Sequence, residues 1–322
     1  MSLIATLQFL PNSPVCPSEL SLCGSEYRRP IVKVYAYSAA IYFDSVSVDG
    51  KWECGVVCEG DIKDTVIQTA FLQTSGTFTA GIVAIQSSSK TIVVAFRGVN
   101  YLSDWITNIK FTKWSAPWLN DGDVSTNHKR VPFPENLEWW LEHMLIYYQC
   151  ILMIPDSHWI PDRLSRCSIT HDGRYQTAQK NHPGFKLVFA GHSLGGALAT
   201  LAAADYVNHE SGDTPNVSLY TYGEPRIGNL EWADWFNSLP LASYRVTSQN
   251  DPVPRLPPYM LGYYHTKQEY FIASDKVTKT CTNSDIAGET TDCSTKTLFE
   301  TGIYAHIYGY YWPSGGREIL DS

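Results

Sequence analysis

Short apolar runs alternate along this chain with amphipathic or alanine-rich segments. The β-branched runs 81–85 and 91–96, joined by the polar turn 86–90, predict two strands buried on both faces. Further strands are predicted at 187–190, 217–222, 243–248 and 267–273, and helices at 31–43, 175–182, 194–205 and 230–237. Strands that alternate with helices predict an α/β fold with a largely parallel sheet covered by helices on both faces.

One stretch joins a strand to a helix through the sequence Gly191-His-Ser-Leu-Gly195. G-x-S-x-G between these two elements is the nucleophile-elbow motif of α/β-hydrolases. The turn is so tight that Gly191 and Gly195 must flank it, because side chains there would clash with the backbone. The N-terminus of the following helix favours negative charge beside the serine. We therefore predict Ser193 as a nucleophile; the alternative is a plain glycine-rich turn.

Composition narrows the classes of partner and the domain organisation. The net charge of −8 over 322 residues argues against nucleic acid or an anionic membrane as an electrostatic partner. The most apolar segment, 144–154, is too short for a transmembrane segment. We expect an irregular N-terminal arm over residues 1–29 and one domain over residues 30–322. Within that domain, residues 130–174 have an atypical sequence.

The eight cysteines form no C-x-x-C pair, and no histidine cluster suggests zinc, so we expect no metal. An even number of cysteines in loop-like surroundings favours disulfides and an oxidising compartment. The predicted pairings, strongest first, are Cys281–Cys293, which brackets a polar loop, and then Cys54–Cys58 and Cys16–Cys23.

The N-terminal residues do not clearly predict where the protein is located. Residues 1–10 are mildly apolar but lack a basic start and a clear cleavage site, which makes them a poor signal peptide. Either a leader lies outside this sequence or the protein is not secreted. Given the cysteines, we expect a secreted protein rather than a cytoplasmic one.

A serine nucleophile needs an imidazole base and a carboxylate that orients it. In α/β-hydrolases these groups follow in the order serine, acid, histidine. Asp251 stands where the predicted strand 243–248 ends, and only His265 and His306 follow it. Because the strand 267–273 must still form after His265, His306 is the better base. We expect His265 to be a hydrogen-bonded loop histidine.

The tetrahedral oxyanion of ester hydrolysis needs two preorganised donors. The backbone N–H of Leu194, just after the serine, is one candidate. The N–H of Val99, in the loop after the strand 91–96, is the other. For Arg97-Gly98 the alternative is a simple strand-ending turn.

Residues 101–111 have apolar side chains at helical spacing and predict a short amphipathic helix. It is either an ordinary surface helix or a lid whose apolar face covers a lipid-binding cleft. The candidate lid residues are Tyr101, Leu102, Trp105, Ile106 and Ile109.

Four ordered motifs resemble the fungal lipase class 3 family, which includes triacylglycerol lipases, mono- and diacylglycerol lipases and feruloyl esterases. The motifs are Phe96-Arg-Gly98, Gly191-His-Ser-Leu-Gly-Gly-Ala197, Tyr222-Gly-Glu-Pro-Arg-Ile-Gly-Asn229 and Asn250-Asp-Pro-Val-Pro-Arg-Leu-Pro-Pro258. The resemblance implies an α/β-hydrolase fold and ester hydrolysis through an acyl-enzyme, with no cofactor and no metal. By position it implies a triad of Ser193, Asp251 and His306, oxyanion donors at Val99 and Leu194, and a lid at 101–109.

Two departures from the family pattern concern function. The family usually has Ser or Thr after Phe-Arg-Gly, whereas Val99 keeps the N–H and lacks the hydroxyl. A Val-His-x-Gly-Phe strand and turn, usual in the family, is missing here. Residues 130–174 instead read as foreign sequence, either a true insertion or an error in the gene model.

We expect a lipase that hydrolyses acylglycerols at an oil-water interface, because Trp105 in the candidate lid and the aromatic segment 113–119 favour lipid esters. A feruloyl-type esterase is the alternative enzyme. A lipase-like protein that binds lipid with weak or no turnover is the alternative from another class.

Overall fold

The computed structural model describes residues 23–72, 80–98, 174–209, 216–259, 262–273, 278–281, 293–294 and 302–310. Within these ranges the chain forms an eight-stranded sheet whose strands lie in sequence order. The strands are β1 (Thr65–Leu72), β2 (Ala80–Gln86), β3 (Thr91–Phe96), β4 (Lys186–His192), β5 (Val217–Tyr222), β6 (Ala242–Ser248), β7 (Glu269–Ile272) and β8 (Thr278–Thr280). Strands β3 to β7 are parallel, and the remaining pairs are antiparallel. The predicted α/β class with a largely parallel sheet is confirmed.

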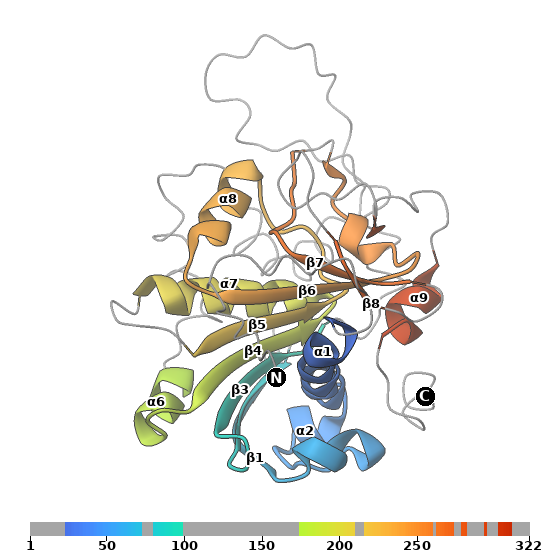
Figure 1. The fold of residues 1–322 in the computed structure, drawn as a ribbon. Coiled ribbons are helices and arrows are strands. Elements are labelled where there is room, and N and C mark those ends of the chain that lie inside the picture. Colours follow the sequence, from blue (N-terminus) through green and yellow to red (C-terminus); the bar gives the residue numbers. More distant parts are fainter. Residues whose placement is uncertain are drawn as a thin grey trace, which may run out of the picture.

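Helices cover both faces of the sheet, as Figure 1 shows. One face packs against α6 (Arg174–Asn181), α7 (Leu194–His209) and α8 (Leu230–Ser238), and the other against α1 (Cys23–Ala40) and α2 (Asp44–Ser47). Alternate side chains of one strand divide between the faces: Leu187 and Phe189 face α7, whereas Val188 and Ala190 lie in the cluster with α1. The near-continuous apolar runs of the sequence therefore belong to strands with two buried faces.

The two strands that sequence reasoning missed lie at the sheet's edges. β1 is only partly buried and exposes 57% of Val66, so its apolar pattern is weak. β8 has three residues and pairs only with β7. An edge strand loses one neighbour, and its sequence carries a correspondingly weaker signal of burial.

Helix α1 begins at Cys23, within the stretch that we expected to be an irregular arm. We expected the arm to end near Pro30, but the helix continues through this proline. The residues before it include Glu26, Arg28 and Arg29, which are good helix formers. Residues 1–22 lie outside the described ranges.

Two of the three predicted disulfides are present, Cys54–Cys58 and Cys281–Cys293. The third predicted partner, Cys16, lies outside the described residues. Cys54–Cys58 encloses the 3-10 helix η1 (Gly55–Cys58), which η2 (Gly60–Ile62) follows. In Cys281–Cys293, Cys281 directly follows β8 and Cys293 directly precedes Ser294.

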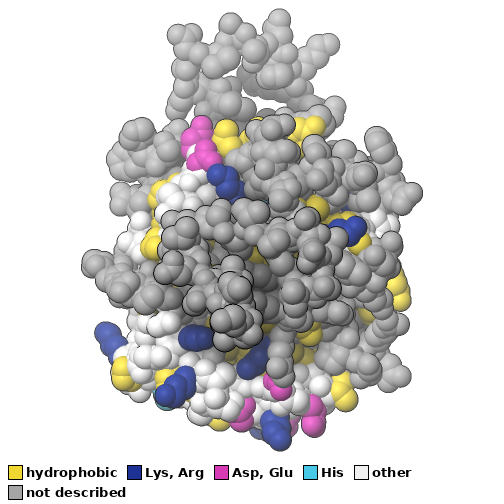
Figure 2. Space-filling view, in the orientation of Figure 1, with side chains coloured by type: hydrophobic (Ala, Val, Ile, Leu, Met, Phe, Trp, Pro, Cys, Tyr) yellow, Lys and Arg dark blue, Asp and Glu magenta, His cyan; other side chains and the backbone are white. Residues whose placement is uncertain are grey.

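In the part of the chain that the structure describes, no helix is long and apolar enough to cross a membrane. Figure 2 shows Lys and Arg side chains interspersed with Asp and Glu side chains at the lower end, where Figure 1 places α2 and β1. This end of the molecule therefore carries side chains of both charges.

Candidate active site

The turn between β4 and α7 holds Ser193 in a strained conformation. Its φ of 60° lies in the left-handed region, which is unfavourable for a residue with a Cβ. A Cβ added at Gly191 would lie 2.0 Å from the carbonyl oxygen of Gly195, and one added at Gly195 would lie 2.2 Å from that of Phe96. Both flanking glycines are therefore required for this turn, as the sequence predicts.

Asp251 lies between the end of β6 and the 3-10 helix that follows it, η6 (Val253–Arg255), and it meets His306 there. His306 Nδ1 lies 2.9 Å from Asp251 Oδ1 and 2.8 Å from Oδ2. The Val253 N–H also donates to Oδ1 at 2.8 Å, and the Tyr310 hydroxyl donates to Oδ2 at 2.5 Å. Since Nδ1 donates to the carboxylate, the neutral imidazole of His306 presents Nε2 as its acceptor.

Tyr310 extends this arrangement beyond the residues that sequence reasoning identified. Its hydroxyl is buried, and burial together with the neighbouring Asp251 raises the pKa of Tyr310 well above its ordinary value. Tyr310 therefore stays protonated, and its hydroxyl donates a hydrogen bond to the carboxylate. His306 itself lies in α9 (Ile303–Tyr308), two residues before that helix ends.

Two atoms of the site are buried without a hydrogen-bond partner among the described residues, Ser193 Oγ and His306 Nε2. Buried polar atoms are usually paired, and these two belong to the serine and the histidine that the sequence assigns to the triad. They are a hydroxyl and an imidazole acceptor, the pair that nucleophilic catalysis requires. Such pairs are often longer than a hydrogen bond when no substrate is bound.

The imidazole of His306 packs against the elbow itself. Its ring centroid lies 4.5 Å from that of His192, the residue before Ser193. On another side lies Gly223, with φ +63°, where an added Cβ would lie 2.8 Å from His306 Cε1. Only glycine leaves room for the imidazole there. The motif that begins at Tyr222 points to this turn, but its contact with His306 is visible only in the folded chain.

The loop after β3 also reaches the elbow. A Cβ added at Gly98 would lie 2.9 Å from the carbonyl oxygen of His192 and 3.0 Å from Ser193 Cβ. Leu194, the other candidate for the oxyanion hole, is the first residue of α7. Val99 lies outside the described residues, as do the candidate lid residues and the atypical sequence up to residue 173.

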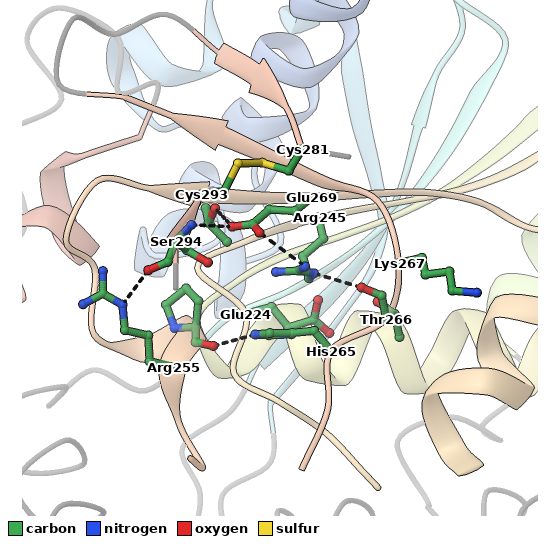
Figure 3. Close-up of polar contacts among 12 residues, drawn as sticks. Glu224, Arg245, Arg255, His265, Thr266, Lys267, Glu269, Cys281, Cys293 and Ser294 are labelled. Carbon is green, nitrogen blue, oxygen red and sulfur yellow. Dashed lines mark hydrogen bonds and ion pairs between the residues drawn. A yellow bond between two sulfur atoms is a disulfide. The ribbon is translucent and has the colours of Figure 1, made fainter. Parts of the chain in front are cut away.

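Loop 249–258, which carries Asp251, is held by buried cationic and imidazole side chains. Arg255 Nη2 donates to the carbonyl of Gln249 at 3.3 Å, and His265 Nε2 donates to that of Pro254 at 2.5 Å. A third donor, Arg226 Nη1, lies 2.9 Å from the carbonyl oxygen of Pro257. We call the buried residues Glu224, Arg226, Arg245, Arg255, His265 and Glu269 the buried ionic network. Its hydrogen bonds fix the backbone on both sides of Asp251. Figure 3 shows the members Glu224, Arg245, Arg255, His265 and Glu269.

His265 is a hydrogen-bonded loop histidine, as expected from the sequence. Burial, and then the charges of Arg245 and Arg226, hold the pKa of His265 well below its ordinary value. The neutral ring of His265 donates through Nε2 to a backbone carbonyl, and this contact is structural.

Glu269, an acidic member of the network, also has hydrogen-bond and ion-pair partners. Glu269 accepts a hydrogen bond from Thr247 Oγ1 at 2.5 Å and one from the Ser294 N–H at 3.3 Å, and it lies 3.9 Å from Arg245 Nη2. Glu269 also lies near Cys281 and Cys293. Because those sulfurs form a disulfide, they are not thiolate ligands for a metal.

Comparisons with known proteins agree with this geometry. The family described as Lipase (class 3) matches residues 168–260. The secreted mono- and diacylglycerol lipase 1 of Fusarium solani is 31% identical over 297 residues, which cover 89% of this chain and 78% of that protein. A lipase structure from Rhizopus microsporus var. chinensis has a TM-score of 0.68 and 26% identity, covering 89% of this chain and 88% of that one.

Another similar structure is described as a triacylglycerol lipase whose catalytic centre is a serine protease triad. It has a TM-score of 0.63 and 27% identity, and the match covers 89% of this chain and 95% of that one. The fold and the elbow define this protein as an α/β-hydrolase. From the similarity to the Fusarium relative along most of both chains, it belongs to the class 3 lipase family.

Proposed function

We propose that this protein is a lipase that hydrolyses the ester bonds of acylglycerols through a covalent acyl-enzyme. Ser193 is the nucleophile, His306 the general base and acid, and Asp251 the group that orients the imidazole. The observation that carries this assignment is the contact of His306 Nδ1 with both oxygens of Asp251, which leaves Nε2 unpaired in the site that also buries an unpaired Ser193 Oγ.

The reaction follows from these positions. Ser193 Oγ attacks the ester carbonyl while His306 Nε2 takes the hydroxyl proton, and Asp251 stabilises the resulting imidazolium. The backbone N–H groups of Leu194 and Val99 bind the oxyanion. As the tetrahedral intermediate collapses, the alcohol leaves with the proton from His306. Water, deprotonated by the same imidazole, then attacks the acyl-enzyme and releases the fatty acid.

The substrate class rests on the relatives and on the lid prediction. The Fusarium relative is named a mono- and diacylglycerol lipase, which supports an acylglycerol substrate here. Ser193 is only 1% exposed, so the residues that cover it must move before an ester can reach it. The amphipathic segment 101–111 is our candidate lid, with Trp105 on its apolar face, and it would open at an oil-water interface.

Secretion is the localisation that we propose for the protein. Two disulfides, Cys54–Cys58 and Cys281–Cys293, favour an oxidising compartment. The Fusarium relative is named a secreted lipase, which supports the same compartment for this chain.

The decisive test compares the wild type with Ser193→Ala on emulsions of mono-, di- and triacylglycerol and on a soluble feruloyl ester. We expect serine-dependent release of fatty acid from at least one glyceride, and a loss of about 10⁴-fold or more in the variant. Ser218→Ala, the same change on β5, is the control and should keep its activity. Circular dichroism verifies that each variant is folded.

Two results would contradict the proposal. A Ser193→Ala variant with undiminished hydrolysis would remove Ser193 as nucleophile. A folded wild-type protein that hydrolyses only the feruloyl ester, or no ester at all, would remove the acylglycerol assignment.

A further inference from the structure

A hydrogen-bonded chain of three residues connects the segment after α1, the elbow and helix α9. Tyr42 follows α1, and its hydroxyl lies 3.0 Å from His192 Nδ1. The opposite ring nitrogen, His192 Nε2, lies 3.0 Å from the backbone carbonyl oxygen of His306. The Tyr42 hydroxyl also packs against Gly98, where an added Cβ would lie 2.7 Å from its oxygen. One side chain thereby contacts two of the segments that form the site.

We propose that Tyr42 is a positioning residue for ester hydrolysis: it fixes the tautomer of His192 and packs between the elbow and the oxyanion loop at Gly98. Tyr42 acts through His192 and Gly98. This inference rests on the proposed function, because it assigns Tyr42 a part in the reaction of Ser193 and His306.

The backbone carbonyl of His306 determines which atom is the donor in each of these hydrogen bonds. The carbonyl of His306 accepts only, so His192 Nε2 carries a proton and donates it. In a neutral imidazole the other nitrogen is then an acceptor, and the Tyr42 hydroxyl donates to it. The two hydrogen bonds together therefore fix which nitrogen of His192 carries the proton.

A neutral His192 suits the chemistry of its neighbour. The two imidazole rings lie 4.5 Å apart between centroids, at an angle of 33°. When His306 takes the serine proton it becomes a cation, and a second cation at that distance would oppose it. Burial, and then the neighbouring His306, hold the pKa of His192 well below its ordinary value.

Tyr42 also restricts the backbone of the oxyanion loop. Gly98 has no side chain to fix its peptide units, and a Cβ added there would lie only 2.7 Å from the Tyr42 hydroxyl oxygen. The next peptide unit carries the Val99 N–H, the proposed oxyanion donor. The Tyr42 hydroxyl packed against Gly98 therefore restricts the backbone there, which matters because oxyanion donors must be aimed before the reaction.

The first test is Tyr42→Phe, which removes the hydroxyl and keeps the ring. On a soluble short-chain ester we expect kcat to fall about tenfold to a hundredfold, the range for a slightly misplaced catalytic group. KM should stay within about twofold, since Tyr42 acts on the transition-state geometry. Tyr37→Phe is the matched control, because it removes a buried tyrosine hydroxyl of the neighbouring helix α1, which donates to Gln86 Oε1 at 2.9 Å. Both its constants should stay within about twofold.

Two kinetic outcomes would overturn the assignment. One is a Tyr42→Phe variant whose kcat stays within about twofold of the wild type. The other is an equal fall in Tyr42→Phe and Tyr37→Phe, which would mean that loss of any buried hydroxyl has this effect.

The second test uses ¹⁵N-labelled histidine and NMR, and it needs no turnover. The His192 signals, assigned by their absence in His192→Gln, should show a neutral ring with the proton on Nε2 at neutral pH. In Tyr42→Phe they should shift, because Nδ1 has lost its donor. A wild-type His192 that is charged or protonated on Nδ1 would overturn the inference. Absence of hydrolysis in the wild type would instead contradict the proposed function, with the NMR result still deciding the tautomer.

Discussion

Two buried polar regions share loop 249–258, and they differ in what their hydrogen bonds do. In the buried ionic network, Glu269 accepts two hydrogen bonds and faces Arg245, and His265 donates to a carbonyl. In the candidate triad, Asp251 is equally well bonded, but Ser193 Oγ and His306 Nε2 have no partner among the described residues. The network supports the loop, whereas the triad keeps open the two atoms that the reaction needs.

His265 and His306 differ in the same way, although they are residues of one type. Both are buried, and each uses one ring nitrogen to hold a neighbour. His265 donates to a backbone carbonyl, which carries no net charge, beside two arginines that disfavour an imidazolium. His306 donates to a carboxylate, which favours one. Only the second environment suits a general base.

The largest effect that would test this comparison is expected for His306→Ala. Without the base, kcat should fall about 10⁴-fold or more, as for other triad histidines. His265→Ala should lower kcat less than about tenfold and act mainly on stability, because it leaves a buried carbonyl without its donor. Ester hydrolysis and urea unfolding of both variants separate the two effects. If His265→Ala were the more damaging to kcat, the two roles would have to be exchanged.

The next effect concerns the pH dependence of stability. Glu224 accepts hydrogen bonds from Thr200 Oγ1 at 2.5 Å and Thr221 Oγ1 at 2.7 Å, and burial raises its pKa from 4.5 to about 7. Between these values the native state holds a proton that the unfolded state has released. Glu224 therefore lowers stability progressively as the pH rises from about 4.5 to about 7, by about 3 kcal/mol in all.

Glu224→Gln removes this ionisation while keeping the size of the side chain. We expect the variant to gain stability relative to the wild type as pH rises, by up to about 3 kcal/mol at pH 8, and to gain little at pH 4. Urea unfolding at the two pH values measures the difference. Glu231→Gln, exposed at the start of α8, is the matched control and should show no such trend. A gain that is equal at both pH values would contradict the assignment.

The smallest effect lies at the oxyanion hole, where the proposed site lacks a hydroxyl. Val99→Ser adds a donor beside the developing negative charge, so kcat should rise about tenfold, less than the full value of an oxyanion donor. Val99→Ala controls for the loss of bulk. The two variants are compared on the soluble ester, and an equal kcat in both would show that the hydroxyl contributes nothing.

Local sequence was sufficient for the central strands and the elbow. The strands β2 to β4 have near-continuous apolar runs because both their faces are buried, and Gly191 and Gly195 are required by the turn they flank. The chain order of serine, acid and histidine, together with strand ends, selected Asp251 and His306. The edge strands β1 and β8 were missed, because half-buried or very short strands leave little pattern to read.

The supporting contacts were decided by tertiary structure alone. Tyr42 and His192 are far apart in the chain, as are Gly223 and His306, and no local pattern predicts that they meet. The same holds for Tyr310 and its bond to Asp251. Sequence determines a turn or a strand through interactions between near neighbours. The position of an imidazole, its tautomer and the donors around it depend instead on packing between distant segments, which exists only once the sheet has formed.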